Sequence, residues 1–176
     1  MRRIFVRAVK FLLMLPHRLN TKIELGADTY VHFRARLSKD GLIKVGDGCF
    51  IDSGTWLMPH GGSIFIGDGV SINRNCVIYG HGIVKIGSNV HIANSCKIVA
   101  SNHSIDRDPN GNMRFNRLIN KGIEIGDNVW LGSNVIVLDG VVIGNNCVIG
   151  AGSVVTKSLN GDGIYVGNPA RFLRKA

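Results

Sequence analysis

A six-residue repeat over residues 125–159 constrains the fold of this chain more than any other feature. Written in sixes, the segment reads IGDNVW, LGSNVI, VLDGVV, IGNNCV, IGAGSV and VTKSL. The first position is always a branched aliphatic residue, and the fourth position of each complete six is Asn or Gly. Neither a helical period nor strand alternation gives a period of six, whereas a short strand followed by a tight corner does. The repeat therefore predicts a parallel β-helix, in which equivalent residues of successive coils stack.

The same period continues toward the N-terminus in a less regular form. It fails over residues 101–122 and returns at Ile125. We therefore expect an all-β chain of about six coils, each of three short strands, with one protruding loop near residues 101–122. A loop of this length inside a compact repeat is usually functional. The earlier coils are predicted to begin at four residues: Leu25, Val45, Ile66 and Ile86.

The two ends of the chain depart from the repeat. Residues 1–22 hold six basic residues and no acidic one, out of a net charge of +9, and they precede the β-helix of residues 23–160. The apolar run inside this segment is too short to cross a bilayer, so we expect an amphipathic helix that caps the coil, binds an anionic membrane surface, or does both. Residues 161–176 are expected to form a C-terminal extension that ends in a short helix after Pro169.

The four cysteines all fall on the fifth position of a hexapeptide, where a small interior residue is needed: Cys49, Cys76, Cys96 and Cys147. We therefore predict buried thiols that act as small hydrophobic side chains. The chain has no CxxC pair, which argues against a zinc site or a redox motif. Basic residues cluster only near the two ends, and no nucleic-acid-binding module accompanies them, so nucleic acid is not an expected partner.

The hexapeptides, a histidine at the break in the repeat and the ending VGNPARFLR together resemble the left-handed β-helix acyltransferases. The similarity covers roughly residues 60–174, and the galactoside, maltose and polysaccharide O-acetyltransferases are the branch it matches. The resemblance implies a left-handed coil, acetyl-CoA as cosubstrate, and a homotrimer with active sites in the clefts between subunits.

Acetyl transfer to a hydroxyl requires a base near that hydroxyl and a hydrogen-bond donor for the developing oxyanion. His103, in SNHSID where the repeat breaks, matches the catalytic histidine of the family, and imidazole suits proton transfer near neutral pH. Ser133 matches the residue that stabilises the oxyanion. Asp106 is a candidate to orient the His103 ring or contact the substrate, with a backbone carbonyl as the alternative partner of the ring.

The resemblance also assigns substrate residues. Asn73 in INRNCV matches the acceptor-binding asparagine of the family. His81 replaces an acidic residue of the galactoside-type members, which favours a different hydroxyl pattern or an acidic sugar, although a polar corner residue is an equal alternative. The expected coenzyme-binding residues run from the thioester end to the phosphates, which basic side chains suit: Trp130, Ser133, Ala151, Thr156, Lys157, Arg171 and Arg174. We expect the last two to share one side of the short terminal helix.

These residues favour an acetyl-CoA-dependent O-acetyltransferase acting on a sugar in cell-surface polysaccharide assembly, with a lipid-linked saccharide as one form of the acceptor. The expected location is the cytoplasm, with the inner face of the membrane as a further possibility. A serine or xenobiotic acetyltransferase and a non-catalytic scaffold remain alternatives. The zinc-dependent carbonic anhydrases built on the same coil need three histidine ligands, two of them closely spaced. Here the residue five positions beyond His103 is Asp108, so no metal site is predicted.

Overall fold

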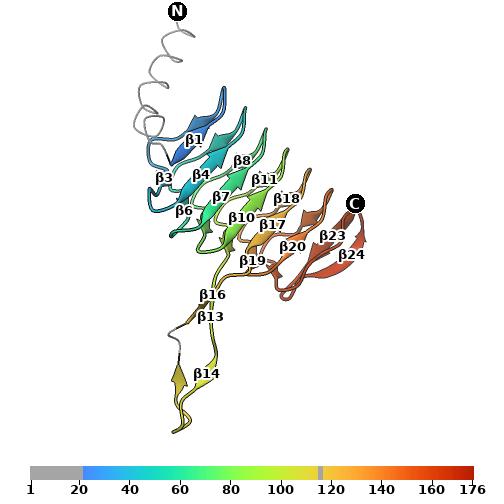
Figure 1. Ribbon diagram of the computed structural model, residues 1–176. Helices are drawn as coiled ribbons and strands as arrows, with labels where there is room; N and C mark the ends of the chain where they lie inside the picture. Colours follow the sequence, from blue (N-terminus) through green and yellow to red (C-terminus); the bar gives the residue numbers. More distant parts are fainter. Residues whose placement is uncertain (1–21, 115–116) are drawn as a thin grey trace, which may run out of the picture.

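The computed structural model describes residues 22–114 and 117–176, and every regular element in these ranges is a β-strand. The chain winds in successive coils, and the strands of these coils form three sheets that make the three faces of a prism (Figure 1). Within each sheet, the strands of neighbouring coils pair in parallel. The helix and the membrane contact predicted for residues 1–22 lie almost wholly outside the described residues and stay predictions. The fold class read from the hexapeptides, an all-β left-handed parallel β-helix with a protruding loop, is confirmed.

Each coil contributes one strand to each face of the prism. Sheet A consists of β1 (Ile23–Leu25), β4 (Leu42–Val45), β7 (Ser63–Ile66), β10 (Ile83–Ile86), β17 (Ile123–Ile125) and β20 (Val142–Ile143). Sheet B consists of β2 (Tyr30–Val31), β5 (Phe50–Ile51), β8 (Ser71–Ile72), β11 (His91–Ile92), β18 (Trp130–Leu131), β21 (Val148–Ile149), β23 (Gly163–Val166) and β24 (Arg171–Lys175). Sheet C consists of β3 (Arg36–Leu37), β6 (Trp56–Met58), β9 (Val77–Tyr79), β12 (Lys97–Val99), β19 (Ile136–Leu138) and β22 (Val154–Val155).

In the described chain, six coils therefore have a strand in all three sheets, as the sequence predicted. A seventh, partial coil consists of a bridge between Leu159 and Ile143 together with β23. We name the turns by the sheets they join: the AB, BC and CA corners. The fourth hexapeptide position turns these corners, because Asn128, Asn134 and Asn146 all have a left-handed backbone, with φ of 56°, 60° and 57°.

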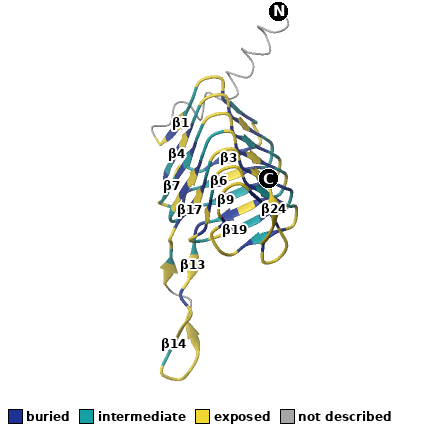
Figure 2. Cartoon of the chain, turned by 90° about the vertical axis from the view of Figure 1, so that its right-hand side faces the viewer, coloured by how far each residue is buried: buried dark blue, intermediate teal, exposed yellow. Residues whose placement is uncertain are grey.

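The interior of the prism is a column of aliphatic side chains, one layer for each coil. Buried residues accordingly recur along the successive coils of the prism (Figure 2). Each strand alternates an inward and an outward residue, so stacked isoleucines are fully buried, such as Ile43 on Ile64 in sheet A and Ile78 on Ile98 in sheet C. The four cysteines are buried in the same column and are free thiols, which confirms their assignment to the interior.

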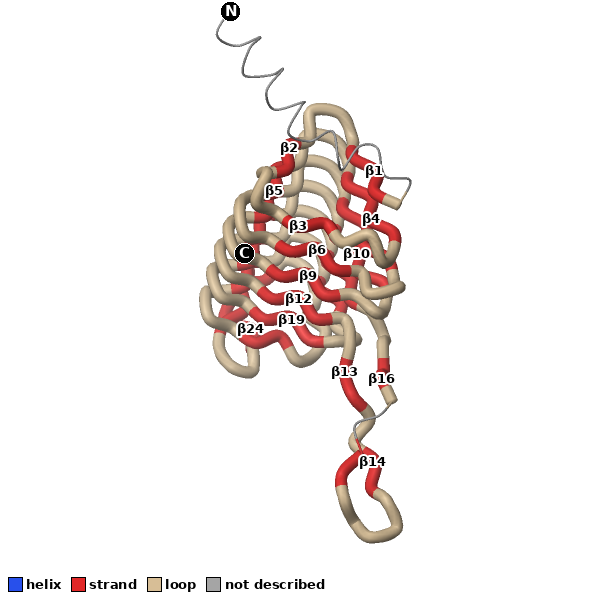
Figure 3. Tube along the Cα trace, turned by 90° about the vertical axis from the view of Figure 1, so that its left-hand side faces the viewer, coloured by secondary structure: helices blue, strands red, loops and turns tan. Residues whose placement is uncertain are grey.

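The protruding loop is an arm of two short antiparallel ladders that leaves the CA corner of the fourth coil (Figure 3). The ladder nearer the prism pairs β13 (Asn102–His103) with β16 (Leu118–Ile119), and the outer ladder pairs β14 (Asp106–Arg107) with β15 (Met113–Arg114). Repeat register returns at Ile123, the first residue of β17.

The prediction of a short helix after Pro169 is wrong. Residues 171–175 form β24, which pairs antiparallel with β23 at the end of sheet B. The free edge of β23 offers unpaired backbone groups to the returning chain, and this pairing overrides the weak local helical pattern. A register shift places Arg174 opposite Ile164 and Arg171 opposite Val166. Because Ile164 and Val166 point to one face of their strand, the bulge puts both arginines on the outer face together.

Candidate active site

His103 lies on the arm, outside the prism. It is exposed in β13 and faces Leu118 across the inner ladder. Its backbone N–H donates to Asn102 Oδ1 at 2.9 Å. The neighbouring Ser104 is buried, and its backbone N–H donates to the Arg117 carbonyl at 2.8 Å, which ties the two sides of the arm together. The arm therefore presents the imidazole away from the interior of the prism.

Asp106 belongs to the outer ladder, where its backbone partner is Arg114. Its predicted role in orienting the His103 ring stays a prediction. The tip of the arm is held by a different carboxylate: Asp108 Oδ1 accepts from the backbone N–H groups of Asn110 and Asn112, each at 2.9 Å. These hydrogen bonds, that from the Asn112 backbone first, lower the pKa of Asp108 below its ordinary value.

The CA corner below the arm carries a stack of rings from consecutive coils. The His81 ring lies parallel to that of His60, with centroids 4.9 Å apart and planes at 13°, and Tyr79 is tilted against both. His60 Nδ1 lies 3.2 Å from Asp40 Oδ2. Asn120, at the base of the arm, donates through Nδ2 to the His81 carbonyl at 3.3 Å. The corner thus connects the predicted acceptor residue His81 to the arm that holds His103.

Sequence reasoning missed Asp40 and His60. The signal that points to them is the spacing: Asp40, His60 and His81 stand about one coil apart at the same corner. One coil of spacing means direct stacking in a β-helix.

The BC corner gathers a second set of predicted residues. The column of residues at this corner includes Asn73, Ser133 and Ala151, on the third, fifth and sixth coils. Ser133 and Ala151 take the third position of their hexapeptides and Asn73 takes the second. Asn73 N–H donates to the Ile92 carbonyl at 2.9 Å, and the Ser133 carbonyl accepts from Gly152 N–H at 2.8 Å. These main-chain bonds fix the backbone, while Asn73 and Ser133 themselves stay partly exposed.

Gly132, Ala151 and Gly152 keep the corner around Ser133 free of bulky side chains. A Cβ on Gly132 would approach the Ala151 nitrogen to 2.7 Å, so this close approach of two coils requires glycine. A Cβ on Gly152 would meet nothing within 4 Å, so the space beside Ala151 is open. Trp130, which precedes this corner on the outer face of sheet B, is 54% exposed. An exposed indole beside an open, small-residue corner is suited to hold an extended ligand.

The predicted phosphate-binding residues do not come together within one chain. Thr156 and Lys157 are exposed at the CA corner of the sixth coil, after β22, whereas Arg171 and Arg174 lie on sheet B. The predicted base and the predicted oxyanion donor are also apart within one chain: Ser133 lies at the BC corner, and the arm of His103 begins at the CA corner. A strand of sheet C separates the two corners in every coil (Figure 3).

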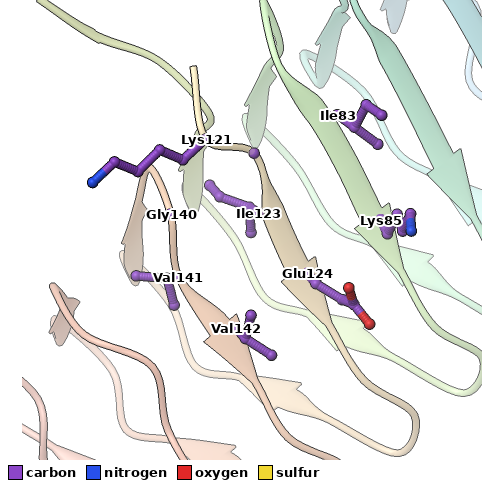
Figure 4. A pocket seen from close by; sticks show the side chains of 9 residues that line it. Ile83, Lys85, Lys121, Ile123, Glu124, Gly140, Val141 and Val142 are labelled. Carbon is purple, nitrogen blue, oxygen red and sulfur yellow. The ribbon is translucent and has the colours of Figure 1, made fainter. Parts of the chain in front are cut away.

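A separate hollow of about 310 Å³ lies on the outer face of sheet A, near the base of the arm (Figure 4). Ile83, Ile123 and Val142 line it, with Lys85 opposite Glu124 on the neighbouring strand. None of the residues predicted for the active site lines it, so it is distinct from both corner groups.

The buried thiols are poor nucleophiles. Burial raises the pKa of the Cys49 and Cys147 thiols, and the hydrogen bond with Cys96, followed by burial, raises that of Cys76. The same hydrogen bond lowers the pKa of the Cys96 thiol, but this side chain is only 1% exposed and lies inside the core. Neither a protonated thiol nor one that a substrate cannot reach forms an acyl-enzyme. Within the described ranges, no group of three or more His, Cys, Asp or Glu side chains is arranged to hold a metal ion. Nor does any helix in this part of the chain have the length and apolar character to cross a membrane.

Comparison with known proteins identifies the family. Residues 122–157 match the model described as bacterial transferase hexapeptide (six repeats). The galactoside O-acetyltransferase of Escherichia coli is 34% identical over 145 residues, covering 82% of this chain and 70% of that protein. The chain belongs to the hexapeptide-repeat acyltransferases. The putative lipopolysaccharide biosynthesis O-acetyl transferase WbbJ of the same organism is 32% identical over 178 residues, covering 97% of this chain and 88% of WbbJ.

Other acetyltransferases of the family are longer than this chain, which covers 55% of a putative acetyltransferase from Schizosaccharomyces pombe at 38% identity. A hexapeptide-repeat acetyltransferase from Vibrio cholerae, solved with acetyl coenzyme A, superposes with a TM-score of 0.63 at 30% identity and covers 86% of this chain and 70% of that one. AntD, an N-acyltransferase from Bacillus cereus, superposes with a TM-score of 0.78 at 23% identity, covering 90% of this chain and 85% of AntD. The AntD match shows the shared fold. The resemblance drawn from the hexapeptides is therefore confirmed, and with it the enzyme class, an acyltransferase.

Proposed function

We propose that this chain is an acetyl-CoA-dependent O-acetyltransferase that acts on a sugar hydroxyl in the assembly of a cell-surface polysaccharide or lipopolysaccharide. The observation that carries the proposal is an exposed histidine on an arm that interrupts the repeat of a hexapeptide acyltransferase. The similarity to WbbJ over nearly the whole chain supports the saccharide acceptor, and the acetyl coenzyme A in the Vibrio cholerae structure supports the donor.

In this reaction the His103 imidazole accepts the proton of the acceptor hydroxyl while the hydroxyl oxygen attacks the thioester carbonyl. The Ser133 hydroxyl donates a hydrogen bond to the carbonyl oxygen as negative charge develops on it. The imidazolium then returns its proton to the departing thiolate. Because the buried thiols do not serve as nucleophiles, acetyl passes directly from donor to acceptor.

The residues at the BC corner fit the donor. The open space at Gly152 and the small side chain of Ala151 leave room for the narrow pantetheine arm beside the exposed Trp130. Lys157, Arg171 and Arg174 are exposed and suit the phosphates at the far end of coenzyme A. We assign Asn73 and His81, together with Asp106, to the acceptor side.

The assembly proposed for this enzyme is a homotrimer with each active site between two chains. The support is the placement of His103 and Ser133 on different corners of the prism. The arm extends away from its own prism (Figure 1) and carries exposed apolar side chains, with Ile105 75% and Leu118 43% exposed. A neighbouring subunit would cover them. The proposed location is the cytoplasm, which agrees with four free cysteines, and attachment to the inner face of the membrane is an option within it.

The test is coenzyme A release from acetyl-CoA over a panel of sugars and nucleotide sugars, with wild type, His103→Ala and Asn110→Ala. Asn110 lies at the tip of the same arm and contributes only its backbone N–H to the turn, so its substitution controls for disturbance of the arm. We expect His103→Ala to lower kcat at least a hundredfold with an unchanged KM for acetyl-CoA. Equal turnover by wild type and His103→Ala would remove His103 as the base. No binding of acetyl-CoA by wild type would overturn the proposed function.

A further inference from the structure

A hollow of about 530 Å³ lies at the BC corner of the first two coils, below the column that holds Asn73 and Ser133. Phe33, Arg34, Ala35 and Arg36 from the first coil line it, with Ser53, Gly54, Trp56 and Asn75. We call this set of residues the lower BC groove. It lies outside the predicted donor and acceptor residues and has no role in the transfer step.

Two exposed aromatic rings form the walls of the lower BC groove. The Phe33 side chain is 57% exposed and the Trp56 side chain 39% exposed. Each ring carries an arginine: the Arg34 guanidinium lies 5.5 Å from the Phe33 centroid, and the Arg36 guanidinium lies 4.9 Å from the Trp56 centroid. Such stacking fixes the planar guanidinium and leaves its edge N–H groups available to a ligand.

The charges of these arginines are not neutralised by neighbours. Arg74, one coil above the groove, forms an ion pair with Asp52, with Nε and Oδ2 3.2 Å apart. Among the described residues, neither Arg34 nor Arg36 forms an ion pair. The floor of the groove is Gly54, where a Cβ would collide with the Asn75 side chain. The groove thus combines two available cations, two ring faces, an amide and a hydroxyl on a small-residue floor.

We infer that the lower BC groove binds an acidic saccharide and that the acceptor is an anionic sugar chain rather than a single sugar. A carboxylate accepts paired hydrogen bonds from a guanidinium, and the apolar face of a pyranose packs on an indole. Asn75, on the same corner turn as Asn73, lines the groove. Ser133 lies four coils above Phe33, or about 19 Å. Only a chain of several sugars spans that distance. This inference rests on the proposed function, since it extends the acceptor site of the same enzyme.

The test uses the fluorescence of Trp56 in the full-length chain. The chain has two tryptophans, so a Trp130→Phe background leaves Trp56 as the sole source of indole emission. The probes are an oligogalacturonate of about eight units and a maltooligosaccharide of the same length, the acidic and neutral members of a matched pair. We expect the acidic chain to change the emission and the neutral chain to bind at least tenfold more weakly.

Variants then assign the binding to the groove. Arg36→Gln should weaken the acidic oligosaccharide at least tenfold, and Lys39→Gln removes an exposed positive charge from the same coil at the CA corner as the matched control. Equal effects of the two substitutions, or equal binding of acidic and neutral chains, would overturn the inference. A response to vesicles of phosphatidylcholine and phosphatidylglycerol without a response to saccharide would also overturn it, because the groove would then be a membrane contact. A change of oligomer mass in Arg36→Gln would overturn it as well, because the groove would then be a subunit contact.

The two proposals fail separately. Acetyl-CoA binding and coenzyme A release are measured on the wild-type chain. If acetyl-CoA binds and a monosaccharide is acetylated while the oligogalacturonate does not bind, the groove inference is wrong and the acetyltransferase stands. If the oligogalacturonate binds but acetyl-CoA does not, the saccharide site stands and the proposed function is wrong.

Discussion

Single residues at the AB corner maintain the stacking of the coils. Asp47 Oδ1 accepts from Ala27 N–H at 2.6 Å, and Asp68 Oδ1 accepts from Asp47 N–H at 2.8 Å. Ser88, Asp127 and Asn145 continue the ladder, each accepting from the coil before it. The corner amides lie outside the strand ladders, so these side chains satisfy main-chain donors that would otherwise need water.

We predict that Asp127→Ala lowers the free energy of unfolding by about 0.5–1.5 kcal/mol, because the exposed Ser88 N–H exchanges its acceptor at 2.7 Å for water. Asp127→Asn keeps an acceptor oxygen at the same position and should cost less than half as much. Urea unfolding monitored by circular dichroism measures both values. A loss in the Asn variant as large as that in the Ala variant would show that charge, rather than the hydrogen bond, stabilises this corner.

At the same scale, the sequence was sufficient to predict the corner residues and the buried cysteines, since both follow from the local six-residue repeat. It was not sufficient to predict the ring stack of His60 and His81. Each of these histidines has a left-handed backbone, with φ of 47° and 74°, and in the sequence each reads as a corner residue. Their contact depends on the register between coils, including the extra residues at each CA corner, and that register is a long-range property.

Among the elements, the arm and the C-terminal strand β24 show where the local sequence pattern does not predict the structure. A break in the repeat predicts a loop, but the two ladders of the arm depend on antiparallel pairing between residues that are up to 17 apart. An isolated two-stranded hairpin is only marginally stable in water, so local turn chemistry at its tip matters. The segment of β24 has a weak helical pattern, yet it forms a strand because the edge of β23 is available for pairing.

We predict that the tip of the arm loosens only in acid. The pKa of Asp108 is lowered in the folded chain by its hydrogen bonds with Asn112 and Asn110, so the stabilisation is fully present above the unfolded value, near 3.9, and is lost as pH falls through the lower folded value. The amide ¹⁵N shifts of Asn110 and Asn112 report this transition by NMR. A midpoint at or above the ordinary aspartate value would contradict it. Asp108→Ala should show the loosened state at neutral pH while the coil amides stay unchanged.

On the scale of the whole molecule, the prism places the predicted base and the predicted oxyanion donor at two different edges. The arm of His103 leaves the CA corner, and the Ser133 hydroxyl is at the BC corner with Asn73 and Ala151. A β-helix is a rigid stack, so the two edges of one chain cannot fold toward each other without breaking strand pairing in sheet C. Direct transfer needs base and oxyanion donor at one reacting centre. The division is therefore the strongest structural argument for a site that two subunits share.

Subunit mixing tests that argument. His103→Ala and Ser133→Ala chains, each inactive alone, are unfolded together at equal concentration and refolded. If every site takes His103 from one chain and Ser133 from its neighbour, random trimers regain about a quarter of the wild-type activity, because one ordered pair in four is intact. A chain carrying both substitutions, mixed with wild type in equal amounts, is the control for dilution of active subunits. If each chain holds a complete site, the two single variants recover nothing on mixing, however well the trimer forms. Recovery near a quarter would place the reacting centre between chains and identify His103 and Ser133 as its two halves.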